Sequence, residues 1–183
     1  MALTAGQLEL LKDRTWRLNN LYKIVNKVGK VERFKLNTAQ TRLLGEMHFL
    51  NIVLKARQMG FSTFIDILAL DCCLFNENFS VGLIADTLDN SKKLMARFKF
   101  AYDNLAAVIR EGVPTLTDNT EEIKFSNGSS ITVGTSLRSG TYNFIHISEY
   151  GKICAKDPGK ADEIKSGALN TLAPGQLGFI EST

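Results

Sequence analysis

Short apolar runs alternate with longer amphipathic segments along most of this chain, and this alternation restricts the fold more than any other feature. Runs typical of buried strands occupy residues 52–54, 80–85, 143–147 and 177–181. Apolar residues at helical spacing fill residues 38–49, 62–75, 88–110 and 160–172. Strands that alternate with helices pack as a mainly parallel sheet with helices on both faces. We therefore predict an α/β fold.

An antiparallel hairpin is expected to interrupt this alternation. Asn127-Gly128, the strongest short-range hairpin signal, separates residues 121–125 from residues 130–134. A chain of 183 residues fits one domain with a single large core. Because the last predicted strand ends next to Thr183, we expect this chain to be a piece of a longer protein.

The N-terminal segment differs from the rest in charge. Residues 1–35 hold eight Lys and Arg against three Asp and Glu, whereas the whole chain has a net charge of only +3. Apolar residues at helical spacing predict one or two amphipathic helices over residues 6–28. We expect a basic helical appendage at residues 1–35 and a core domain at residues 36–183. The basic residues are typical either of a solvated helix face or of a surface that binds phosphates or an acidic partner.

Composition excludes several classes of protein. No run approaches the roughly 18 apolar residues that a membrane span needs, so we expect a cytoplasmic protein without a membrane partner. Cys72, Cys73 and Cys154 lack metal-binding spacing and are odd in number, so we expect three reduced cysteines in the core. His146 has only His48 for company and is interpreted as a core histidine.

The turn after the first predicted strand has the layout of a phosphate-binding loop. It reads KARQMGFST from Lys55 to Thr63 and leads directly into a helix, whose N-terminal amides favour an anion. Against the pattern G-x-x-x-x-G-K-[ST], Gly60 and Ser62 match, whereas Lys55 stands at the first glycine and Phe61 replaces the lysine. Lys55 or Arg57 could supply the missing cation, and Ser62 keeps the hydroxyl that Mg²⁺ needs. The alternative is an ordinary polar turn.

A second predicted strand ends in an acidic residue. Residues 144–147 are mostly apolar and are followed by Ser148 and Glu149. In P-loop ATPases such a strand carries the group that orients the attacking water, so Glu149 is the candidate base, and Ser148 stands where a metal-side acid is usual. Arg138 precedes this strand on a loop, from which a guanidinium could reach a γ-phosphate in its own or a neighbouring subunit. Taken alone, Glu149 and Arg138 are also typical of solvated surface charges.

Together these segments resemble the ATPase domain of the large terminase subunit of tailed bacteriophages, from about residue 34 to the end. LNTAQ at residues 36–40 resembles the adenine-recognition motif, with Gln40 in the base-reading position. KARQMGFST is similar to the deviant phosphate loops of this family, and FSNGSSITVGTSLRSGTYNFIHISE matches its run of hairpin, arginine loop and acid strand. FIEST resembles the motif that couples hydrolysis to movement. Phe61 and Ser148 depart from the family pattern.

The resemblance implies a P-loop NTPase fold of the additional-strand type and an ATPase motor that packages double-stranded viral DNA, with ATP and Mg²⁺ as cofactors. The implied catalytic residues are Glu149 and Arg138, and the implied metal-side residues are Ser62 and Ser148. The implied ATP-binding residues are Gln40, Lys55, Ala56, Arg57, Gln58, Met59, Gly60, Phe61, Ser62 and Thr63. The implied coupling residues are Glu181, Ser182 and Thr183.

The resemblance also implies partners that lie outside this chain. They are double-stranded viral DNA, the portal protein, the small terminase subunit and further copies in a ring of five, assembled in the host cytoplasm at the portal vertex of the procapsid. A nuclease domain is expected only beyond residue 183. Two alternatives remain: a helicase-like translocase with the same core, and a non-catalytic nucleotide-binding or assembly module.

Overall fold

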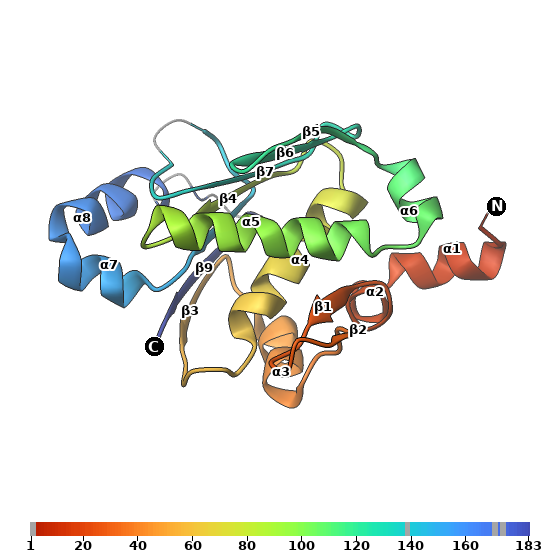
Figure 1. The fold of residues 1–183 in the computed structure, drawn as a ribbon, viewed down its shortest axis with the longest axis horizontal. Helices are drawn as coiled ribbons and strands as arrows, with labels where there is room; N and C mark the ends of the chain where they lie inside the picture. Colours follow the sequence, from red (N-terminus) through yellow and green to blue (C-terminus); the bar gives the residue numbers. More distant parts are fainter. Residues whose placement is uncertain (1–2, 138–139, 170–171, 173–174) are drawn as a thin grey trace.

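The computed structural model describes residues 3–137, 140–169, 172 and 175–183. Its centre is a seven-stranded sheet in the order β3-β9-β8-β4-β7-β6-β5 (Figure 1). The strands are β3 Leu50–Leu54, β4 Ser80–Ile84, β5 Thr115–Asp118, β6 Glu122–Phe125, β7 Ser130–Gly134, β8 Phe144–Ile147 and β9 Leu177–Ser182. The pairs among β3, β9, β8, β4 and β7 are parallel, and β5, β6 and β7 form an antiparallel meander. The predicted α/β fold is confirmed, and the predicted hairpin is β6–β7.

Helices cover both faces of the sheet. They are α3 Thr38–Glu46, α4 Phe61–Phe75, α5 Leu88–Asp103, α6 Ala107–Gly112, α7 Tyr150–Lys156 and α8 Pro158–Gly167. One face of the sheet packs on α4 and α5, which supply much of the larger apolar core. The other face packs on α7 and α8 in a second cluster that includes Ile145 and Ile180. Helix α4 has 15 residues, and nearly all of them are buried. Its sequence is therefore apolar on almost every side.

The N-terminal segment is only partly helical. It forms α1 Ala5–Lys12, α2 Arg14–Asn20 and a small antiparallel hairpin of β1 Lys23–Val25 and β2 Val31–Arg33. The expectation of helix up to residue 28 is therefore wrong beyond Asn20. The Asn26 side chain accepts hydrogen bonds from the amides of Val28 and Lys30, and Gly29 adopts a φ of 79°, so the chain turns here.

A buried ion pair joins this segment to the core. The Arg17 guanidinium donates to both carboxylate oxygens of Asp71 on α4, at 2.9 and 2.7 Å, and the Tyr22 hydroxyl donates to the same carboxylate at 2.7 Å. The guanidinium also lies 4.2 Å from the centre of the Phe75 ring. Leu18, Tyr22 and Phe34 are buried in the larger core together with the residues of α4.

Three further expectations need correction. The helix expected over residues 88–110 ends at Asp103, and α6 begins separately at Ala107. The helix expected over residues 160–172 is α8, which starts at Pro158 because the Asp157 side chain caps it, and the unexpected α7 precedes it. Cys72 and Cys73 are buried as expected, but Cys154 is exposed because it lies on the outer side of α7. In the described part of the chain, no helix is long and apolar enough to span a bilayer.

The strand order brings distant segments to one edge. β9 is the last strand in the chain, yet it lies between β3 and β8, with Val53 opposite Glu181 and Ile147 opposite Ile180. Because these strands are parallel, their carboxyl ends meet at the same edge of the sheet. Ligands bind in this position in open α/β sheets.

Candidate nucleotide-binding site

The loop between β3 and α4 is shaped to expose backbone amides. Gln58 and Gly60 adopt the left-handed conformation, with φ of 65° and 74°, and Gly60 occupies the N-cap position of α4. No side chain caps this helix, so its first amides are available to an anion. A strained non-glycine residue such as Gln58 persists only where the surrounding structure holds it, and such strain concentrates at functional loops.

Lys55 points back across this loop. Its ammonium lies 3.3 Å from the Ser62 hydroxyl and 3.4 Å from Oε2 of Glu181, and its side chain is only 8% exposed. Phe61, at the usual lysine position, is buried in the apolar core. Arg57 is exposed and makes no hydrogen bond or ion pair with the described residues. Of the two candidate cations, Lys55 is therefore the one that the fold holds beside the loop.

Gln40 braces the loop from the side. Its amide nitrogen donates to the Gly60 carbonyl at 3.0 Å, and its amide oxygen accepts from the Asn37 backbone at 3.0 Å. Gln40 and Gly60 also line a pocket of about 430 Å³ between the loop and the β1–β2 hairpin. Phe34 and Thr63 line the same pocket. The pocket adjoins the phosphate loop, which is where the base of a bound nucleotide would need room.

Glu149 stands at the end of β8 in a strained conformation. Its φ is 58° and its ψ is 41°, in the left-handed region that non-glycine residues rarely adopt. Its carboxylate lies 2.9 Å from the Lys152 ammonium and accepts a hydrogen bond of 3.2 Å from the Thr183 hydroxyl. The backbone thus directs this side chain away from the strand and toward the end of β9.

Residues 181–183, at and just after the end of β9, link the β3–α4 loop to the segment that follows β8. The Ser182 carbonyl accepts from the Lys55 amide at 3.1 Å, while the Ser182 hydroxyl accepts from the Gly151 amide at 3.2 Å. Thr183 binds Glu149 as described above, and Glu181 accepts a hydrogen bond of 3.1 Å from the Ser148 hydroxyl. These residues contact both halves of the site.

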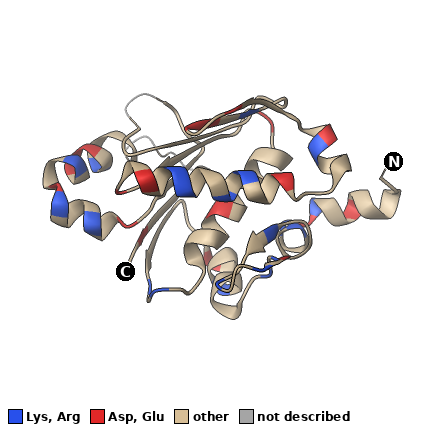
Figure 2. Cartoon of the chain, in the orientation of Figure 1, with Lys and Arg blue, Asp and Glu red and all other residues tan. Residues whose placement is uncertain are grey.

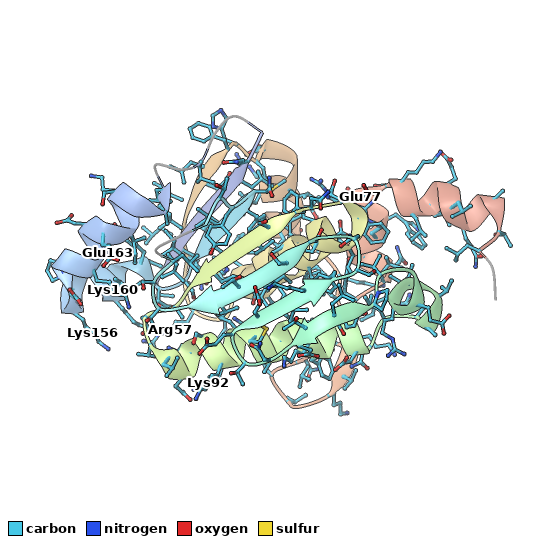
Figure 3. The ribbon with its side chains drawn as sticks, turned by 90° about the horizontal axis from the view of Figure 1, so that it is seen from above. Arg57, Glu77, Lys92, Lys156, Lys160 and Glu163 are labelled. Atoms are coloured by element: carbon cyan, nitrogen blue, oxygen red, sulfur yellow. The ribbon has the colours of Figure 1, made fainter. Side chains whose placement is uncertain are left out.

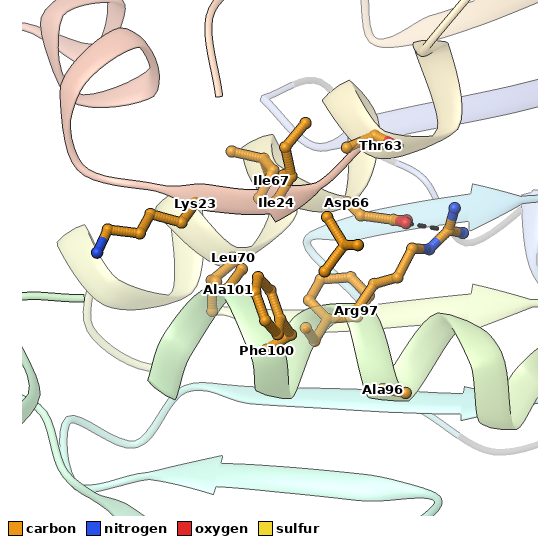
Figure 4. Close-up of a pocket in the computed structure, with 12 residues that line it drawn as sticks. Lys23, Ile24, Thr63, Asp66, Ile67, Leu70, Ala96, Arg97, Phe100 and Ala101 are labelled. Carbon is orange, nitrogen blue, oxygen red and sulfur yellow. Dashed lines mark ion pairs between the residues drawn. The ribbon is translucent and has the colours of Figure 1, made fainter. Parts of the chain in front are cut away.

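Behind the site, the buried side chains of Glu181, His146 and Asp66 form a row that ends at the partly exposed Arg97. The His146 imidazole lies 3.4 Å from Glu181 and 3.3 Å from Asp66, and Asp66 lies 3.0 Å from the Arg97 guanidinium. Figure 4 shows this last ion pair at the edge of a largely apolar pocket of about 280 Å³ between β1, α4 and α5. Neither imidazole nitrogen is aligned for a hydrogen bond with the described residues, so the contacts of His146 are charge contacts.

Glu181 and His146, which are neighbours in this row, stabilise each other's charged forms. Burial opposes a charge on Glu181, but the contacts with His146, Ser62 and Lys55 outweigh it and lower the pKa of Glu181 to about 2. Burial also opposes the imidazolium, yet Asp66 and Glu181 raise the pKa of His146 to about 9. Sequence reasoning treated His146 as an ordinary core residue and missed this row.

Basic residues surround the carboxyl edge of the sheet. Figure 2 shows Lys and Arg on α7, α8 and the loop after β3, at the end of the molecule where the C-terminus lies. Figure 3 labels Arg57, Lys92, Lys156 and Lys160 at this end, from four different segments. Such cations attract phosphates, and acidic residues such as Glu163 lie among them at the same end. Arg138, the other predicted cation, lies outside the described residues.

The strand order can be compared with known folds. β9 lies between β3, which leads into the loop at residues 55–60, and β8, which is followed by Ser148 and Glu149. The chain has the fold of phage large terminase ATPase domains. It aligns over 99% of its length with the HK97 bacteriophage large terminase, at 13% identity and a TM-score of 0.73, and covers 38% of that protein.

Two further solved structures match over the whole chain. They are the large terminase ATPase domain of Thermus phage P74-26 and a point mutant of it, each with 15% identity, a TM-score of 0.59 and 70% of its length covered. No family model and no curated protein sequence matches the chain. The likeness therefore lies in the fold.

Proposed function

We propose that this chain is the ATPase motor domain of a terminase large subunit, which hydrolyses ATP to package double-stranded viral DNA into a procapsid. The observation that carries the proposal is the position of Lys55. It reaches from the start of the loop to within 3.3 Å of the Ser62 hydroxyl. The cation that is missing at Phe61 is thereby restored at the place where the phosphates of a nucleotide would lie.

Each element of the site has a role in this reaction. The amides at the start of α4 and the Lys55 ammonium bind the β- and γ-phosphates, and Gln40 holds the loop against the base pocket. Glu149 orients the water that attacks the γ-phosphorus, and Lys152 and Thr183 hold its carboxylate in place. Arg138 would add a positive charge at the γ-phosphate from its own or a neighbouring subunit.

The site also fits the Mg²⁺ that accompanies ATP. The Ser148 hydroxyl donates to Oε1 of the buried Glu181 carboxylate, whereas Oε2 has no hydrogen bond to the described residues and lies 3.4 Å from the Lys55 ammonium, which also contacts the Ser62 hydroxyl. Hydroxyl and carboxylate oxygens are the ligands that Mg²⁺ and its bound waters prefer. When bound, Mg²⁺ neutralises charge on the phosphates.

The partners follow from the same proposal. The chain spans 38% of the HK97 large terminase, so a nuclease domain and the contacts with the portal, the small subunit and DNA belong to the whole protein. The basic carboxyl edge is suited to phosphates of either ATP or DNA. Assembly would place the chain in a ring, proposed to be of five copies, at the portal vertex of the procapsid in the host cytoplasm.

Exchange of the catalytic carboxylate tests the proposal. Glu149→Gln should leave nucleotide affinity near that of the wild type and lower the rate of ATP hydrolysis by roughly 100-fold or more, as for loss of a positioned base. The matched control is Glu121→Gln, which neutralises an exposed glutamate just before β6, a strand three places from β8 in the sheet. Single-turnover hydrolysis with labelled ATP measures the rate. Retained turnover would remove Glu149 from the mechanism, and ATP binding without turnover in the wild type would indicate a non-catalytic module.

A further inference from the structure

A buried carboxylate at the phosphate loop has one oxygen without a hydrogen-bond partner. Glu181 is fully buried at the end of β9. Its Oε1 accepts from the Ser148 hydroxyl and contacts His146, whereas Oε2 has no hydrogen bond to any described residue and faces the Lys55 ammonium at 3.4 Å. The Lys55 ammonium and the Ser62 hydroxyl both act on this carboxylate, yet Oε2 is held by charge rather than by an aligned hydrogen bond, so it can take a further partner.

The position of this carboxylate is relevant because Ser148, just after the end of β8, stands where an acidic residue is usual. In P-loop ATPases, an acid on that strand holds Mg²⁺, together with the loop hydroxyl. Here Ser148 adds no charge. Its hydroxyl is instead turned to Glu181, and the neighbouring loop hydroxyl of Ser62 shares the Lys55 ammonium with the same carboxylate. Glu181 lies beside both serines, because the Ser148 hydroxyl donates to its carboxylate and the Ser62 hydroxyl also acts on it.

The surrounding charges keep this carboxylate ionised and in place. His146 contacts it from behind, and Asp66 contacts the other side of the imidazole. Lys55 is its partner on the open side. When a triphosphate draws the Lys55 ammonium to its own oxygens, Oε2 is left facing the loop with its charge unpaired on that side, which favours a divalent cation there.

On the basis of the proposed function, we propose that Glu181 is the metal-side carboxylate of the nucleotide site. It replaces, from the neighbouring strand, the acid that Ser148 does not supply, and it holds Mg²⁺ through its bound water. Ser62 contributes its hydroxyl to the same cation. His146 is a positioning residue for this carboxylate.

The Mg²⁺ dependence of nucleotide binding tests the assignment without any need for hydrolysis. The dissociation constant of a non-hydrolysable ATP analogue is measured by calorimetry with Mg²⁺ and with EDTA, and the ratio of the two constants gives the contribution of the metal. Glu181→Gln should reduce that ratio by roughly 10- to 100-fold, the usual effect of losing an outer-shell metal partner. Affinity in EDTA should stay the same or improve, because Lys55 loses a competing anion.

Three variants complete the design. Asp86→Asn removes another carboxylate just beyond the end of β4, outside the site described above, and should keep the wild-type ratio. Ser148→Ala should lower the ratio by no more than about threefold, since its hydroxyl carries no charge and contacts only the Glu181 carboxylate among the described side chains. The double variant Glu181→Gln with Ser148→Asp should recover most of the ratio, because it returns a carboxylate to the acid strand.

The outcomes separate this inference from the proposed function. A wild-type ratio in Glu181→Gln overturns the assignment and leaves the ATPase proposal intact. A complete loss of the ratio in Ser148→Ala also overturns it, and this variant decides the question if Glu181→Gln does not fold by circular dichroism. A wild-type chain that binds no nucleotide with either Mg²⁺ or EDTA overturns both proposals.

Discussion

At the scale of single residues, the unusual feature is Lys55, a cation at the start of the β3–α4 loop rather than at its end. Lys55 is held by Ser62 and Glu181 rather than left in solvent. Its side chain is therefore ordered before a nucleotide arrives, and little rotamer entropy remains to be lost on binding. Arg57 has the better geometry for bidentate contact but projects from an exposed part of the loop.

Substitution of the two cations should separate their roles. Lys55→Ala is expected to weaken ATP binding by roughly 10- to 100-fold, since a hydrogen bond to a charged group contributes about 1.5–3 kcal/mol. Arg57→Ala should have a smaller effect, and Phe61→Leu should leave affinity near that of the wild type because Phe61 is a core residue. Titration with a fluorescent ATP analogue measures all three. Unchanged affinity in Lys55→Ala would assign the phosphate contact to Arg57 or to a neighbouring subunit.

The buried histidine should make stability depend on pH. The pKa of His146 is raised to about 9 in the folded chain and is near 6.5 when unfolded, so its contribution to stability is complete below pH 6.5 and is lost as pH rises toward 9. The free energy of unfolding in urea should therefore fall by roughly 1–3 kcal/mol between pH 6 and pH 8.5. His146→Gln should be less stable at pH 6 and should lose much of this dependence. An equal slope in both proteins would show that other groups cause it.

At the scale of helices and strands, the N-terminal segment is tied to the core by charge. Arg17 and Asp71 are both buried and form a bidentate pair between α2 and α4. Removal of one member of such a pair leaves an uncompensated buried charge, which is far more costly than loss of an exposed pair. The link also holds the β1–β2 hairpin beside the proposed base pocket.

A stability comparison checks this link. Arg17→Ala should lower the free energy of unfolding by about 3–5 kcal/mol. Arg42→Ala, which removes an exposed pair with Glu46 on α3, should lower it by less than about 1 kcal/mol. Urea unfolding followed by circular dichroism measures both variants at the same pH. Similar losses in the two would contradict a structural role for the buried pair.

The elements that sequence alone predicts are those with a long, regular apolar pattern. The helix of α4 and the strands β3, β4, β8 and β9 follow from such runs, and the β6–β7 turn follows from Asn127-Gly128. The β1–β2 hairpin was missed because its few apolar residues also fit helical spacing, and only the Asn26 turn decides between the two.

The candidate site also has residues that the sequence predicts and residues that it does not. The loop and Glu149 are local signals, since a glycine turn between strand and helix and an acid at a strand end can be read from neighbouring residues. The row from Glu181 through His146 to Asp66 is not local. Its members meet only because β9 inserts between β3 and β8 over α4, and the order of strands in a sheet is not written in any one segment.

At the scale of the whole molecule, the isolated chain should be a slow enzyme. If Arg138 acts on the ATP of a neighbouring copy, a monomer lacks a group that can be worth roughly 10³–10⁵ in rate. Turnover per chain should then rise with protein concentration, and Arg138→Ala should abolish that rise without changing nucleotide affinity in dilute solution. Steady-state assays over a wide concentration range, with size measured by light scattering, provide the check. Fast turnover that is independent of concentration would exclude a role between subunits.

The central place of β9 has a consequence for how the chain folds. Asn51 on β3 hydrogen-bonds to Gly178 on β9, 127 positions later, and β3 reaches the rest of the sheet only through β9. During synthesis, β4 to β8 can pair as soon as they leave the ribosome, whereas β3 must wait for almost the last residues. Closing so long a segment is slow, because its entropy is lost before the contacts form. The loop between β3 and α4 should thus be among the last parts to become ordered, and on the proposed function a chain that ends before β9 should not bind nucleotide.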